Sequence, residues 1–165
     1  MRNRIFRYEI WIVVLLILMP LILIAFDNGN TRSSISNYVY MTNNQVFYFL
    51  LFLAASMFGN NGALWLKNYN ILLGVFLAGV ALTPHLQFPI IHQLFAALFF
   101  AGSIFVMIFF SSKEQRKYKI YAGIFITIGM LGHFATNWYS LFWAEWIGML
   151  PICIHFIGES KGKID

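Results

Sequence analysis

Apolar segments alternate with short polar stretches along the whole chain, and most of the apolar segments approach the ~20 residues that a membrane-spanning helix requires. They lie at about 10–26, 46–66, 69–84, 89–110, 118–136 and 140–158. The third and fifth are short unless they include polar residues at their ends. This pattern predicts an all-α integral membrane protein, a bundle of about six transmembrane helices that forms one domain over residues 1–165.

The basic residues fall almost entirely in alternate connections of this pattern. Because Lys and Arg accumulate in cytoplasmic loops, we expect the N- and C-termini to be cytoplasmic. With six spans, Arg32 is the only basic residue expected on the outer side of the membrane. The residues expected inside are Arg2, Arg4, Arg7, Lys67, Lys113, Arg116, Lys117, Lys119, Lys161 and Lys163.

The composition agrees with a membrane protein, since 60% of the residues are hydrophobic and only 10% are charged. A chain of this length cannot build a water-soluble surface from so few charges. The net charge of +5 is explained by the loop distribution, so it gives no support for nucleic-acid binding. We expect a multi-pass protein of the plasma or cytoplasmic membrane that is in contact with membrane lipids.

The longest connection, residues 27–45, is rich in Asn, Ser and Thr and is expected on the outer side. It is polar enough to lie over the outer mouth of the bundle, and it is the segment through which a protein partner or a second copy would bind. The single cysteine, Cys153, lies in an apolar segment and allows no internal disulfide.

One acidic residue, Glu145, lies within a predicted span, and three histidines are expected at a similar height near the outer side. His85 lies in the turn before the fourth span, His92 in the first turn of that span, and His133 near the outer end of the fifth. His155 lies ten residues after Glu145 in the same span and is therefore ~15 Å deeper. An ionisable residue inside a membrane is costly unless it is paired or hydrated, so this polar layer is the candidate site.

Three interpretations of the layer compete. A zinc or general acid–base centre would use His92, His133 and Glu145, but no His-x-x-x-His or His-Glu-x-x-His pair is present. A hydrogen bond between Glu145 and one histidine would instead fix helix packing, and we favour that over a metal. The working hypothesis is that these groups bind a lipid headgroup in the outer leaflet without catalysis or cofactor.

Short motifs in three parts of the chain resemble the six-helix family of the damage-regulated autophagy modulator and the post-GPI-attachment lipid-remodelling factor, with related bacterial membrane proteins. The motifs are Ile35-Ser36-Asn37 in the outer loop, His92 with Ala96, Phe99, Phe100 and Gly102, and Glu145-Trp146 in the last span. The chain departs from the family pattern at Asn37, Tyr38 and Phe95. The resemblance implies a role in lipid handling or membrane organisation and adds Ser36 to the candidate ligand-binding residues.

A weaker likeness is to ceramidase-like and progestin-receptor-like membrane hydrolases, which hold zinc through histidines and an Asp in a seven-helix bundle. This chain has fewer predicted spans and no paired histidines in its last span. A metal-dependent intramembrane hydrolase using His and Glu ligands is therefore the alternative function. A small transporter or channel and a membrane-complex subunit are further alternatives.

Overall fold

The computed structural model describes residues 2–110 and 112–160, and it describes side chains from residue 10 to residue 158 within them. This part of the chain contains α-helices, one short 3-10 helix (η1, Ser36–Tyr40) and no strands. The all-helical prediction and the six helices are confirmed. The helices are α1 (Arg2–Phe26), α2 (Asn44–Trp65), α3 (Asn68–Leu82), α4 (Pro89–Phe109), α5 (Lys113–Thr136) and α6 (Leu141–Ser160).

Local sequence explains where the helices begin and end. The turn between α2 and α3 places Leu66 in the left-handed conformation, with φ of 57°, and Asn137 ends α5 in the same way, with φ of 52°. Pro89 occupies the first turn of α4, where its missing N–H costs no hydrogen bond. The chain leaves α1 through Asn28 and Gly29, which both have positive φ.

Among the residues that the structure describes, four helices are long and apolar enough to cross a membrane, namely α2, α4, α5 and residues 141–158 of α6. The apolar part of α1, residues 10–26, is shorter, and so is α3. With 15 residues, α3 is about 22 Å long, less than the ~30 Å hydrocarbon core of a bilayer. Helix α5 begins at Lys113, earlier than the predicted start at 118, because residues 113–117 are helical as well.

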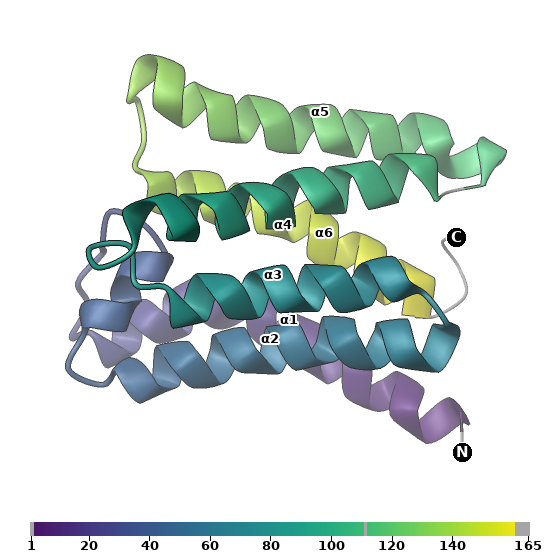
Figure 1. Cartoon of the computed structure of the whole chain (residues 1–165), viewed down its shortest axis with the longest axis horizontal. Helices are drawn as coiled ribbons and strands as arrows, with labels where there is room; N and C mark the ends of the chain where they lie inside the picture. The colour runs from purple at the N-terminus through teal and green to yellow at the C-terminus, as the bar shows by residue number, and fades with distance from the viewer. Residues whose placement is uncertain (1, 111, 161–165) are drawn as a thin grey trace.

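Consecutive helices pack against each other, and α6 returns to α1 (Figure 1). Helix α5 contacts α4 and α6 at the margin of the bundle. One end of the bundle holds the start of α1 and the α2–α3 and α4–α5 turns, and we call it the basic end. The other end, the loop end, holds the remaining three connections. Lys161 and Lys163, also predicted at the basic side, lie outside the described residues.

Large apolar side chains cover the outside of the bundle as well as its core. Leu16, Met19 and Phe142 are almost completely buried in the centre. By contrast, only 28% of the residues in an apolar 18-residue stretch of α4 are buried, and only 17% in the corresponding stretch of α5. Apolar surface of this extent is stable only against an apolar environment or a partner.

Helices α2 and α3 form the closest helix pair, and small and amide side chains make their approach possible. A Cβ added at Gly74 would lie 2.6 Å from the Ala55 carbonyl oxygen, so no larger residue fits without moving the backbone. Nearer the basic end, Asn70 donates a hydrogen bond of 2.9 Å to the Asn61 side-chain oxygen. Both asparagines are buried, and each satisfies part of the other's hydrogen-bonding capacity away from water.

We predict that Gly74→Ala lowers the thermal stability of the purified protein because it separates α2 from α3, at a cost of about 1–3 kcal/mol. Thermal unfolding in detergent measures the effect. Gly59→Ala is the matched control on α2, since a Cβ there meets no atom within 4 Å. The control should retain or raise the unfolding temperature; equal losses for both variants would contradict the close packing.

Candidate functional site

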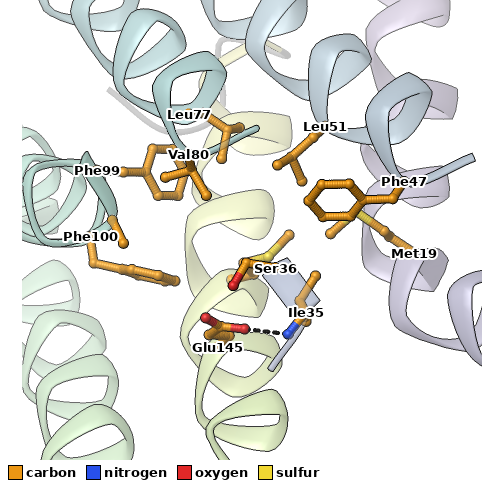
Figure 2. Close-up of a pocket in the computed structure, with 12 residues that line it drawn as sticks. Met19, Ile35, Ser36, Phe47, Leu51, Leu77, Val80, Phe99, Phe100 and Glu145 are labelled. Carbon is orange, nitrogen blue, oxygen red and sulfur yellow. Dashed lines mark hydrogen bonds between the residues drawn. The ribbon is translucent and has the colours of Figure 1, made fainter. Parts of the chain in front are cut away.

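Glu145 lies in the second turn of α6, and its side chain points to the connection between α1 and α2 at the loop end (Figure 2). The Ile35 N–H donates a hydrogen bond of 2.5 Å to its Oε2 atom. The backbone of Ser36 makes a further interaction with the same carboxyl group. A carboxyl oxygen accepts such bonds in either protonation state, so the tie does not depend on ionisation.

Residues 27–43, which we call the first connection, are folded against the end of the bundle and carry η1. The Phe142 N–H donates to the Ser33 carbonyl oxygen over 2.8 Å, which gives a second tie to α6. Tyr38 is fully buried, and its hydroxyl donates to the Asn30 carbonyl oxygen over 2.9 Å. Burial raises the pKa of the Tyr38 phenol, so it remains a neutral donor at physiological pH.

An ion pair within the first connection joins Asp27, where the connection begins, to Arg32. Arg32 contacts Asp27 through Nε at 2.7 Å and through Nη2 at 3.1 Å. The hydrogen bond to Asp27 raises the pKa of the Arg32 guanidinium further above its usual value. Arg32 is the basic residue that the charge pattern places on the outer side, and Asp27 compensates its charge there.

Next to the Glu145–Ile35 hydrogen bond, on the side of the bundle centre, lies a small cavity with apolar walls, which we call the cavity beneath Glu145 and which is above it in the view of Figure 2. Every helix except α5 contributes to it, and so does η1. Glu145 and Ser36 are its polar residues. The apolar lining consists of Met19, Ile35, Phe47, Leu51, Leu77, Val80, Ala96, Phe99, Phe100 and Met149.

The cavity offers about 40 Å³ to the centre of a water-sized sphere, which exceeds the ~10–15 Å³ that one water requires. It is much smaller than the ~150 Å³ cavity that accommodates benzene in an engineered protein. Met19, Phe47 and Leu51, on α1 and α2, are buried. Accessible surface remains at Ala96 and Phe100 on α4, at Met149 on α6 and at Val80 on α3.

His92 is buried at the start of α4, and its Nδ1 lies 2.7 Å from the Thr83 carbonyl oxygen. The contact closes the α3–α4 turn. The His85 ring lies between the rings of His92 and Tyr40, at centroid distances of 6.1 Å from each. These two histidines therefore form a ring cluster above the turn.

His133 serves the α5–α6 turn in a similar way. Its Nδ1 lies 2.6 Å from the Tyr139 carbonyl oxygen. The Tyr139 hydroxyl in turn donates to the Gly129 carbonyl oxygen. A Cβ at Gly132 would lie 2.5 Å from that hydroxyl oxygen, so the glycine leaves room for the tyrosine.

The candidate residues thus divide among three connections at the loop end. Glu145 and Ser36 come together at the cavity, His85 and His92 lie at the α3–α4 turn, and His133 lies at the α5–α6 turn. Within the described residues, no three His, Cys, Asp or Glu side chains are close enough to hold a metal ion. Nor does a hydrogen bond join Glu145 to a histidine there, so the geometry favours neither the zinc centre nor the Glu–His pair.

Sequence reasoning missed the partner of Glu145, because that partner is a backbone N–H that any residue type supplies. It also missed the apolar walls of the cavity, since Leu77 or Val80 look like ordinary core positions. The Asp27–Arg32 ion pair could have been predicted from the sequence, because an acidic and a basic residue lie five residues apart in a polar loop.

We predict that Glu145→Ala speeds hydrogen exchange at the Ile35 and Ser36 amides by about tenfold, since a buried N–H left without its acceptor costs about 1–3 kcal/mol. Hydrogen exchange with mass spectrometry in detergent measures it. Glu145→Gln is the control because its amide oxygen still accepts the bond. Unchanged exchange in Glu145→Ala would show that the tie does not hold the first connection.

Comparison with known proteins places the chain in a family but assigns no activity. Neither a curated protein nor a solved structure matches it. A family model, described as the family of unknown function DUF7103, matches residues 18–160. That range includes five complete helices, the first connection and Glu145, so the chain belongs to the DUF7103 family.

Proposed function

We propose that this chain is a multi-pass membrane protein, embedded by its helices with the basic end in the cytoplasm, that binds lipid and does not catalyse a reaction. The lipid site is the cavity beneath Glu145, in the outer leaflet. The observation that carries the proposal is a carboxyl group, with Ser36 beside it, at the edge of a cavity with apolar walls inside an apolar bundle.

Membrane embedding is supported by the apolar outer surface and by aromatic residues near both ends. Trp138 and Trp143 are exposed near the loop end, and Trp65 and Tyr118 near the basic end. Such amphipathic rings favour the headgroup region of a bilayer. The two exposed belts are separated by the exposed apolar faces of α4 and α5.

Lipid binding is supported by the division of the cavity into a polar rim and apolar walls. Glu145 and Ser36 suit a polar or hydroxyl-bearing part of a lipid, and Phe99, Phe100 and Met149 suit its first methylene groups. The small volume limits the occupant to the end of a chain or a short segment. Entry would come from the α4–α6 side, where lining residues keep accessible surface.

The resemblance to the lipid-remodelling and autophagy-modulator family points in the same direction and remains a prediction. A partner or second copy at the first connection also remains a proposal. Much of that connection is already committed to the bundle, because Ile35, Tyr38, Val39 and Met41 are buried. A partner would therefore contact its exposed polar residues, such as Thr31 and Ser33.

Orientation is tested with single cysteines in a Cys153→Ser background. Gln87→Cys lies in the exposed α3–α4 turn at the loop end, and Lys117→Cys is exposed near the basic end. In intact cells, an impermeant maleimide should label position 87 but not 117, and both should react after permeabilisation. The reverse pattern would overturn the proposed orientation.

Lipid binding is tested with a photoreactive phospholipid that carries a diazirine in its acyl chain. In wild-type protein we expect cross-links to the α4 and α6 segments that line the cavity. Ala96→Phe should reduce them several-fold because the ring fills the cavity, whereas Ala97→Phe, on the exposed side of α4, should not. Unfolding temperatures show whether both variants remain folded.

Two results would contradict the lipid site. One is a wild-type cross-link pattern confined to the outer faces of the helices. The other is equal cross-linking of the cavity segments in Ala96→Phe and Ala97→Phe.

A further inference from the structure

A second apolar depression lies between α4 and α5, away from Glu145 and its cavity. Its walls are mainly isoleucine side chains, and about 220 Å³ of it is open to the centre of a water-sized sphere. Ile104 and Ile108 form the α4 wall, and Ile120, Gly123, Ile124 and Thr127 are among the residues of the α5 wall. We call it the α4–α5 groove.

Two features give the groove its apolar surface. Gly123 lets the α4 wall approach α5 closely at the floor of the groove, because a Cβ there would lie 3.0 Å from Ile104 Cγ2 and 3.2 Å from Ile108 Cδ1. Thr127 turns its hydroxyl back to the Gly123 carbonyl oxygen, 2.8 Å away, so its polar atom is satisfied within α5. The groove is left with a methyl-rich surface that suits a hydrocarbon chain.

Three basic residues continue the same face of α5 toward the basic end. Positions 120, 123, 124 and 127 follow the three- and four-residue spacing of one helix face. Extending that spacing backwards reaches Lys117, Arg116 and Lys113. All three are exposed, and no ion pair in the described part of the chain involves them.

Basic side chains predominate at this end of the groove face, where Glu114, three residues before Lys117, is the acidic neighbour. Glu114, the acidic residue of the first turn, lies about 100° or more around the helix from the centre of the groove face. A ligand that lies in the groove and extends toward the basic end therefore meets apolar walls first and then three cations. That sequence of environments complements an acyl chain joined to an anionic headgroup.

We infer that the α4–α5 groove, with Lys113, Arg116 and Lys117 at its end, is a binding site for an anionic phospholipid. One acyl chain lies along α5 from Ile120 to Thr127, a rise of about 10 Å, and the phosphate lies among the basic side chains. The inference rests on the membrane embedding proposed above but not on the cavity beneath Glu145. It places the lipid in the leaflet at the basic end.

The test uses native mass spectrometry of the purified full chain with an equimolar mixture of dioleoylphosphatidylglycerol and dioleoylphosphatidylcholine, which share their acyl chains. We expect wild-type protein to retain phosphatidylglycerol over phosphatidylcholine by about fivefold or more. Replacing Lys113, Arg116 and Lys117 with Gln should bring that ratio close to one. A charge-conserving variant, Lys113→Arg with Lys117→Arg, should keep the preference.

A second pair of variants tests the groove itself. Thr127→Phe fills the groove at an exposed position and should lower retention of phosphatidylglycerol several-fold. Leu131→Phe, one turn further along α5 and also exposed, is the matched control and should not. Unfolding temperatures identify any variant that fails to fold.

Three outcomes would overturn the inference: no lipid preference in wild type, an unchanged preference in the triple Gln variant, or equal retention in Thr127→Phe and Leu131→Phe. A dimer that Thr127→Phe dissociates would assign the groove to a second copy of the chain instead. The maleimide labelling and the cavity cross-links do not depend on the α4–α5 groove. A negative result for the groove can therefore be distinguished from a negative result for the proposed function.

Discussion

The hydrogen bond between the Ile35 N–H and the Glu145 carboxyl group joins segments 110 residues apart, and the loop end of the bundle depends on it. The first connection buries Ile35, Tyr38, Val39 and Met41, but burial of side chains leaves its backbone amides without acceptors. Its amides need acceptors when they approach an apolar core, because an unpaired buried N–H costs about 1–3 kcal/mol. Glu145 supplies the acceptor, the Ser33–Phe142 contact adds a second tie, and η1 then covers the cavity (Figure 2).

Helix α5 imposes a second constraint on the molecule. It does not contribute to the cavity beneath Glu145, and few of its side chains are buried. The bundle therefore has one apolar space among α1, α2, α3, α4 and α6, and another between α4 and α5. The inner space ends at a carboxyl group and the outer one continues toward lysines and an arginine, so the two favour different chemical groups at opposite ends.

The sequence predicted the helices well, because apolar runs in this chain are long and the breaks at Asp27, Lys67 and Pro89 are strong. It also identified Glu145 as the acid to explain. It could not identify the acceptors and donors around the candidate residues. His92 and His133 contact the carbonyl oxygens of Thr83 and Tyr139, and backbone groups carry no residue-type signal. Helix rotation, which decides which side chains meet, depends on packing details such as the Gly74–Ala55 approach.

The shared height of Glu145, His92 and His133 therefore has a simpler cause than a common ligand. Each of the three connections at the loop end brings backbone groups close to the apolar bundle, and Glu145, His92 and His133 each make a hydrogen-bonding contact with the backbone of one connection. The contact at Glu145 also borders a cavity. A polar layer in a small helical bundle can thus arise because the backbone groups of its turns require hydrogen-bond partners. Glu145, which also lines a cavity, is therefore the member of this layer that suggests a ligand site.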